Sequence, residues 1–265
     1  MKRLQGQTAV VTGSSSGLGQ GIAIEMGKEG ANVCINYHSD EAGANTTLEA
    51  IEAAGGQGFT IQADVSKPED VERMFQETID TFGTVDILMS NAGIQKDAAF
   101  SDMAHEDWKK VIDVNLSGHF YCAQVAVKEF TRRGTTDYSK ALGKIICMSS
   151  VHDIIPWAGH INYATAKGGV LMFIKTLAQE LGQQKIRVNG ISPGAIKTNI
   201  NEEVWGDPAK LEELMKLVPY QRIGETEDVG KLAVWLASDE SDYVHGQTIY
   251  IDGGMTLYPG FIGNG

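Results

Sequence analysis

The sequence predicts an α/β protein with a doubly wound parallel sheet of seven strands and helices on both faces. Short runs rich in β-branched residues alternate with amphipathic helical patterns, and a glycine-rich turn follows the first of these runs. The 265 residues allow one large domain or two small ones, and the alternation continues throughout. We therefore predict a single domain over residues 1–265.

Seven runs are expected to form the strands, because each is short, apolar and separated from the next by a helical pattern. In chain order they span 8–12, 31–36, 59–62, 85–89, 144–148, 186–191 and 247–251. The stretch 132–144 before the fifth strand is long for a connecting turn. Cys34, Cys122 and Cys147 lie in apolar stretches, so we expect buried thiols and no disulfide framework.

Two of the connecting helices show a clear apolar stripe. The first is predicted to begin at a capping box, Ser66-Lys-Pro-Glu69, and to end at Gly83. Its stripe consists of Val71, Met74, Phe75, Thr78, Ile79 and Phe82. The second is a longer helix with the stripe Trp108, Val111, Ile112, Leu116, Phe120, Ala123 and Val127. Asn115 is an unexpected polar residue in this second helix.

Composition and charge exclude several function classes. The chain has 22 Lys plus Arg against 34 Asp plus Glu, and a net charge of −12 repels nucleic acids and anionic membranes. The first apolar run is too short for a signal peptide or a membrane span, so a cytoplasmic protein is expected. The 6 histidines show no metal-ligand spacing, and no metal site is predicted.

The stretch VVTGSSSGLGQG, residues 10–21, fits two motifs with different chemistry. Gly13-Ser-Ser-Ser-Gly17 fits the G-x-S-x-G elbow of serine hydrolases, whereas Gly13-x3-Gly17-x-Gly19 fits a dinucleotide cradle. An elbow nucleophile follows several strands, but Ser15 follows only the first. A cradle needs glycines between a strand and a helix whose first N–H groups face a pyrophosphate, and this site offers both. We therefore predict a Rossmann-like dinucleotide-binding domain.

The glycine spacing resembles that of the short-chain dehydrogenase/reductase family, and four later segments resemble the family's other motifs in the same order. They are Ser90-Asn91-Ala92-Gly93, Asn115, Tyr163-x3-Lys167 with Ser150 upstream, and Pro193-Gly194 with Thr198. The resemblance implies hydride transfer between a nicotinamide cofactor and an alcohol or carbonyl substrate. The cofactor contacts it implies are Gly13, Ser15, Gly17, Leu18, Gly19, Tyr37, His38, Asp64, Val65, Asn91, Ala92, Gly93, Tyr163, Lys167, Pro193, Gly194, Ile196 and Thr198.

The predicted catalytic residues are Ser150, Tyr163, Lys167 and Asn115. Tyr163 and Lys167 are four residues apart, so they share one helix face. A phenol with a pKa near ~10 is a poor base, and a nearby ammonium and a nicotinamide cation are expected to lower that pKa. By resemblance, Ser150 binds the substrate oxygen, Lys167 binds the ribose and the Asn115 carbonyl holds a water. Taken singly, these residues also fit an exposed helical pair, a strand-end cap and a core amide.

The second strand bears on the choice between NAD and NADP. An acidic residue at its end binds the ribose 2′-hydroxyl of NAD and repels a 2′-phosphate. The strand ends Asn36-Tyr37-His38, without a carboxylate, and Asp40 and Glu41 are expected in the first turn of a helix capped by Ser39. We predict that NADP(H) is favoured and that NAD(H) is also accepted.

Within the family, three segments are similar to bacterial glucose 1-dehydrogenases: 149–157, 193–200 and 252–259. This resemblance implies oxidation of β-D-glucose to glucono-1,5-lactone by a homotetramer. Segments 94–97 and 158–162 differ from those enzymes.

A mobile substrate lid is expected over residues 196–220, where Glu202, Glu203 and Trp205 fit either polar substrate contacts or a surface helix. The alternative functions are a carbonyl reductase acting on ketones, ketoesters or 3-oxoacyl substrates, and a nicotinamide-binding sensor without turnover.

Overall fold

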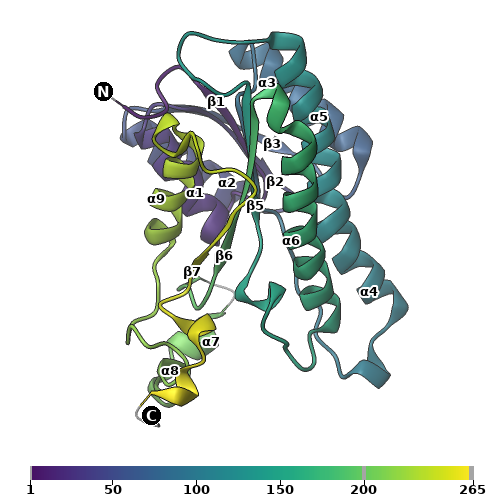
Figure 1. The fold of residues 1–265 in the computed structure, drawn as a ribbon, viewed down its shortest axis with the longest axis vertical. Coiled ribbons are helices and arrows are strands. Elements are labelled where there is room, and N and C mark those ends of the chain that lie inside the picture. The colour runs from purple at the N-terminus through teal and green to yellow at the C-terminus, as the bar shows by residue number, and fades with distance from the viewer. Residues whose placement is uncertain (1, 199–200, 263–265) are drawn as a thin grey trace.

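A computed structural model describes residues 2–198 and 201–262. Seven parallel strands form one sheet in the order β3-β2-β1-β4-β5-β6-β7 (Figure 1). The strands are β1 Thr8–Val11, β2 Asn32–Tyr37, β3 Gln57–Gln62, β4 Ile87–Ser90, β5 Gly143–Met148, β6 Ile186–Pro193 and β7 Thr248–Ile251. The predicted fold class is confirmed, because all seven expected strands form and pair in parallel.

Helices cover both faces of the sheet (Figure 1). One face carries α1 Gly17–Lys28, α2 Glu41–Ala53 and α9 Thr226–Ala237. The other carries α3 Pro68–Phe82, α5 Gly118–Arg133 and α6 Ile161–Leu181, with α4 His105–Ile112 leading into α5. The short helices α7 Glu202–Trp205 and α8 Pro208–Met215 lie beside the C-terminal residues (Figure 1). No helix in residues 2–198 and 201–262 is long and apolar enough to cross a membrane.

The sheet separates two hydrophobic clusters, as the alternation of side chains along each strand requires. In β1, Ala9 and Val11 belong to the cluster under α1 and α9, whereas Val10 belongs to the cluster under α3, α5 and α6. The free thiols are buried, as predicted, and burial raises the pKa of each to about 12; they are Cys34, Cys122 and Cys147.

The prediction of one continuous stripe from Trp108 to Val127 is partly wrong. Residues 113–117 form a π-helical turn between α4 and α5. A π turn contains more residues than an α turn, so the buried face moves along the sequence. Asn115 and His119 are therefore fully buried, whereas Phe120 is 47% exposed.

The predicted capping box at the start of α3 is also wrong. The helix begins at Pro68 with Lys67 at the N-cap position. Ser66 instead donates its hydroxyl to Asp64 Oδ1 at 2.6 Å. The end of the helix is as predicted, because Gly83 adopts the left-handed conformation with φ 85°.

The long segment 132–144 closes over a buried polar group at the amino ends of the strands. Asp86 Oδ2 accepts a hydrogen bond from the Thr8 N–H at 2.8 Å. Its Oδ1 accepts one from the Tyr138 hydroxyl at 3.0 Å and lies 3.1 Å from Arg133 Nη1. The segment thus supplies both a hydroxyl and a cation to a carboxylate that is almost fully buried.

Substitution of Asp86 by Ala is expected to lower the free energy of unfolding by about 3–5 kcal/mol, because Arg133 then keeps a buried, unpaired charge. Urea unfolding followed by circular dichroism measures the loss. Tyr138→Phe is the control: it removes one hydrogen bond and keeps the ion pair, so a loss of about 1 kcal/mol is expected. Equal losses in the two variants contradict the assignment of Asp86 as the centre of this group.

Candidate active site

A cavity of about 1060 Å³ lies where the strands end at their carboxyl sides. It brings together all of the predicted site residues except Tyr37 and Asn115. Those lining it are Gly13, Ser15, Gly17, Leu18, Gly19, His38, Asp64, Val65, Asn91, Ala92, Gly93, Ser150, Tyr163, Lys167, Pro193, Gly194, Ile196 and Thr198. Residues far apart in the sequence therefore share one cavity, as expected at the carboxyl edge of a doubly wound sheet.

The glycine-rich turn is held tightly between β1 and β4. Gly13 has a φ of +61° and Gly17 a φ of +56°, which favour glycine. A Cβ on Gly19 would lie 2.1 Å from the Gly13 carbonyl oxygen. The side chain of Asn91 donates to the carbonyls of Thr12 and Gly13 at 2.9 and 3.0 Å. No larger residue fits at Gly19 without displacing the turn.

The start of α1 is suited to an anion. Ser16 occupies the N-cap position but its side chain forms no capping hydrogen bond, and the first turn contains no acidic residue. The first N–H groups of this helix, at the positive end of the helix dipole, are therefore available to a ligand in the cavity. Such a site fits a dinucleotide pyrophosphate. In the described part of the chain no histidine bonds to Ser15, so the serine-hydrolase interpretation has no base.

The far end of the cavity carries a group of polar side chains after β2 and β3. His38 Nε2 and Lys67 Nζ each lie 3.9 Å from Asp64 Oδ2. Burial raises the pKa of Asp64, but the hydrogen bonds from Ser66 and the nearby His38 and Lys67 side chains outweigh it and hold that pKa below its usual range. Asp64 is therefore ionised at neutral pH at this edge of the cavity.

Two predictions about the end of β2 need correction. Tyr37 packs into the core under α1 and does not line the cavity, because the alternation of β2 points it away from His38. The N-cap of α2 is Asp40 and not Ser39: the Asp40 carboxylate accepts from the Gly43 N–H at 3.0 Å. Asp40, the acidic residue that follows the strand tip most closely in the sequence, thus caps its own helix.

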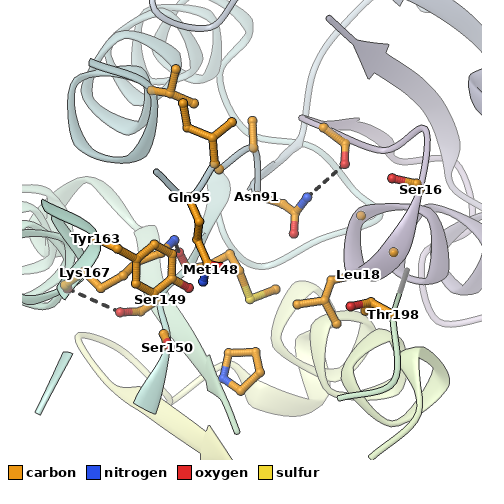
Figure 2. Close-up of a pocket in the computed structure, with 18 of the residues that line it drawn as sticks. Ser16, Leu18, Asn91, Gln95, Met148, Ser149, Ser150, Tyr163, Lys167 and Thr198 are labelled. Atoms are coloured by element: carbon orange, nitrogen blue, oxygen red, sulfur yellow. Dashed lines mark hydrogen bonds between the residues drawn. The ribbon is translucent and has the colours of Figure 1, made fainter. Parts of the chain in front are cut away.

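Three predicted catalytic side chains meet on one side of the cavity, opposite Ser16, Leu18 and Thr198 (Figure 2). The side chains of Ser150 and Gln95 face the Tyr163 hydroxyl (Figure 2) and lower its pKa. Lys167 Nζ lies 5.5 Å from the centre of the Tyr163 ring and donates to the Met148 carbonyl at 2.8 Å.

Gln95 was missed by sequence reasoning. Its only signal was its place in the divergent segment 94–97 behind the Asn91-Ala92-Gly93 motif.

The protein by itself raises the pKa of Tyr163, whereas a lowered pKa is expected for the cofactor-bound enzyme. Burial raises this pKa, and the hydrogen bonds from Ser150 and Gln95 counter only part of the rise. Burial also lowers the pKa of Lys167 to about 8. The Lys167 ammonium bonds to a backbone carbonyl and not to the phenol, so the protein by itself does not bring Tyr163 into the working range.

Asn115 acts on the site through the loop after β4. Its side chain accepts from the Ile94 N–H at 2.8 Å and donates to the Ile94 carbonyl at 2.9 Å. The amide oxygen and nitrogen are thus both hydrogen-bonded within the core, as one of the alternative interpretations held. The predicted role of the Asn115 backbone carbonyl in binding a water is not affected by these bonds.

The predicted lid, 196–220, is described except for residues 199–200, which lie outside the described residues. Trp205 Nε1 donates to the Thr198 carbonyl at 2.9 Å, so this indole anchors the segment. Glu203 lines the cavity, whereas Glu202 and Trp205 do not. Of the three polar substrate contacts considered for the lid, only Glu203 faces the site.

An aromatic stack borders the substrate side of the cavity. Trp157 lies between His152 and His160, with ring centroids 4.1 and 3.5 Å away, and meets Tyr163 edge-on at 6.3 Å. His160 Nε2 lies 3.3 Å from Asp97 Oδ2. The two segments that differ from glucose 1-dehydrogenases, 94–97 and 158–162, therefore contact each other beside Tyr163.

Comparison with known proteins agrees with this geometry. A family model described as enoyl-(acyl carrier protein) reductase matches residues 13–256. The chain is 49% identical over 258 residues to 3β-hydroxysteroid dehydrogenase 1 of Eggerthella lenta, covering 97% of each chain. It is 41% identical over 259 residues to glucose 1-dehydrogenase 2 of Bacillus subtilis, covering 97% of this chain and 98% of the relative.

Solved structures show the same fold. A gluconate 5-dehydrogenase from Burkholderia cenocepacia, in complex with NADP and tartrate, superposes with a TM-score of 0.87 at 33% identity. The match covers 96% of this chain and 97% of that one. The relatives thus match this chain over nearly its whole length, but they are named after different substrates.

Substitution of Gly19 by Ala is expected to weaken NADPH binding about tenfold or more, because the added methyl displaces the Gly13 carbonyl and with it the turn. Titration of NADPH fluorescence measures the dissociation constant. Gly168→Ala is the matched control, since a Cβ there meets its nearest atom, the Asp153 carbonyl, at an ordinary 3.8 Å. Unchanged NADPH affinity in the Gly19 variant contradicts the cradle.

Proposed function

We propose an activity from the premise that the chain belongs to the short-chain dehydrogenase/reductase family. The protein is an NADP(H)-dependent oxidoreductase that acts on a hydroxyl group of a ring compound. One observation carries the proposal: the Tyr163 hydroxyl, the Ser150 hydroxyl and the buried Lys167 ammonium converge in the cavity that the glycine-rich turn enters. Such a group of acid, base and oxygen-binding side chains beside a dinucleotide cradle suits proton transfer coupled to hydride transfer.

Two parts of the cavity would hold the cofactor. The turn at Gly13–Gly19 and the start of α1 would bind the pyrophosphate. Pro193-Gly194 and Thr198, which also line the cavity, would bind the nicotinamide end. When bound, the nicotinamide supplies or accepts the hydride.

The protein's own part in the reaction is the movement of one proton at the Tyr163 oxygen. In the oxidative direction Tyr163 takes the proton of the substrate hydroxyl, and in the reductive direction it returns it. Ser150 accepts the His152 N–H at 3.2 Å, which leaves its own proton for an oxygen in the cavity. Gln95 donates toward the phenolic oxygen and stabilises its charged form. Because burial raises the Tyr163 pKa, oxidation is expected to become faster as pH rises.

The proton is proposed to leave the site behind Lys167. The resemblance places a water on the Asn115 carbonyl, and His119, four residues later, supports a polar space there. Both ring nitrogens of His119 are buried without a partner in the described residues, and burial together with the Lys167 charge lowers the His119 pKa to about 3. A neutral buried imidazole of this kind usually bonds to an ordered water.

The substrate that we propose first is β-D-glucose, oxidised to glucono-1,5-lactone. Support comes from the polar side chains at the substrate side of the cavity, Gln95, Asp97, His152 and Glu203, which suit a polyhydroxylated ring. The B. subtilis relative bears the name of this activity. A homotetramer is the assembly implied by the sequence resemblance.

A 3β-hydroxysteroid is the second candidate. Val204, Leu214 and Met255 bring apolar side chains to the same cavity, and Trp157 borders it. This surface suits a rigid apolar ring system, and the E. lenta relative bears the name of a 3β-hydroxysteroid dehydrogenase. In reverse the same residues reduce carbonyls, the activity named for a 3-oxoacyl-acyl-carrier-protein reductase of Staphylococcus epidermidis that is 37% identical over 251 residues.

Substitution of Tyr163 by Phe is expected to lower kcat by about 10²- to 10⁴-fold, since the proton shuttle is lost while the ring remains. Initial rates of NADP⁺ reduction with D-glucose and with a 3β-hydroxysteroid, and of NADPH oxidation with ketones, identify the substrate. Tyr163-dependent turnover of the steroid but not of glucose makes the second candidate correct. Tight NADPH binding without turnover of any substrate makes the protein a sensor and refutes the proposal.

Substitution of His38 by Asp is expected to lower kcat/KM for NADP⁺ about tenfold or more, because a carboxylate then faces the 2′-phosphate. The kcat/KM for NAD⁺ is expected to stay or rise. His38→Asn, which adds no charge, serves as the control and should change the ratio much less. Equal effects of the two substitutions on both cofactors contradict the placement of the 2′-phosphate beside His38.

A further inference from the structure

One carboxylate joins three strands beneath the catalytic serine. Asp153 Oδ2 accepts hydrogen bonds from the hydroxyls of Ser149 at 2.8 Å and Ser192 at 2.6 Å. Its Oδ1 accepts one from the Tyr250 hydroxyl at 2.8 Å. The donors come from the ends of β5, β6 and β7. Among the residues that the structure describes, Asp153 forms no ion pair, so these hydroxyls are what hold its carboxylate.

Asp153 and its partner Ser192 belong to the two segments whose relative position matters for the reaction. Asp153 ends the short turn Val151–Asp153 that follows Ser150, and its N–H donates to the Ser150 carbonyl at 2.9 Å. Ser192 directly precedes Pro193-Gly194 in β6. The carboxylate therefore connects the segment that carries Ser150 with the segment that would hold the nicotinamide end of the cofactor.

We propose that Asp153 is a positioning residue that sets the substrate oxygen, held by Ser150, relative to the nicotinamide, held by Pro193-Gly194. The inference rests on the proposed function, since it assigns the geometry of the same site. Hydride transfer requires the reacting atoms to be close and aligned, and small displacements of one segment slow it strongly. Hydroxyl bonds to a charged acceptor are short and strong, which suits this task.

The charge of Asp153 also acts on the proton shuttle. It raises the pKa of both Tyr163 and Lys167. The other groups that face the Tyr163 hydroxyl are Ser150 and Gln95, which lower its pKa by hydrogen bonds, and Asp97, which raises it by its charge; Lys167 lies over the ring. His152, on the same turn as Asp153, is held mainly neutral by burial. Removal of the Asp153 charge therefore lowers the pKa of Tyr163.

The test compares Asp153→Asn with Tyr250→Phe. The Asn variant keeps the size of the side chain but loses the charge, and we expect kcat to fall about 10- to 100-fold and the limb of the pH–rate profile that reports Tyr163 to move to lower pH. Tyr250→Phe removes one hydrogen bond and keeps the charge. Tyr250→Phe should lower kcat less than Asp153→Asn does, and it should not move the limb of the pH–rate profile that reports Tyr163.

Two readouts do not need turnover. The ultraviolet absorbance of the phenolate, taken as the difference between each protein and its Tyr163→Phe counterpart, gives the Tyr163 pKa directly; Asp153→Asn should lower it. NADPH fluorescence gives the dissociation constant, which should rise several-fold in Asp153→Asn as the segment after Ser192 loosens. If the wild-type protein turns over no substrate, the proposed function fails, while a lowered Tyr163 pKa and a weakened NADPH affinity still support the inference on Asp153.

The result that overturns the inference is a lower melting temperature in Asp153→Asn with unchanged kcat, pH limb, Tyr163 pKa and NADPH affinity. Asp153 then only stabilises the fold. Should this variant not fold, Ser192→Ala decides the question, because it removes one hydrogen bond to Asp153 and keeps the charge. A several-fold loss of kcat at an unchanged Tyr163 pKa supports the inference, and an unchanged kcat overturns it.

Discussion

The hydrogen bonds between Asn91 and the turn after β1 hold together the point at which the sheet changes its direction of winding. From β1 the chain adds β2 and β3 toward one edge of the sheet, and it then adds β4 to β7 toward the other edge. The strand order therefore reverses between the neighbouring strands β1 and β4. The Asn91 amide bonds to the carbonyls of Thr12 and Gly13, and the Thr12 hydroxyl accepts the Asn91 N–H at 2.8 Å. The site depends on this junction, because a doubly wound sheet opens its crevice there.

The two halves of the crevice use different chemistry for different tasks. The side of α1 presents mainly backbone to the cavity, and glycine is required at position 19 because the first helical turn packs against the Gly13 carbonyl. The side of α6 presents titratable side chains, Tyr163 and Lys167, whose pKa values are displaced by burial. A backbone cradle suits a phosphate group whatever the substrate is, whereas buried titratable side chains suit proton transfer.

Two loop segments border the second half of the crevice. The segments 94–97 and 158–162 meet through Asp97 and His160, and the stack around Trp157 extends this contact to Tyr163. A rigid scaffold with variable loops permits relatives of the same fold to act on different alcohols. The names of the relatives, which include a sugar and a steroid dehydrogenase, fit this division between scaffold and loops.

The sequence by itself determined the layers, the order of the strands' appearance, the glycine cradle and the Tyr163–Lys167 pair, because each depends on local periodicity or short spacing. Only the tertiary structure decided features that depend on distant partners. Tyr138 reaches Asp86 across 52 residues, and Tyr250 reaches Asp153 across 97, with no local pattern to mark either. The π turn at 113–117 was missed because an inserted residue changes the periodicity from which burial is predicted.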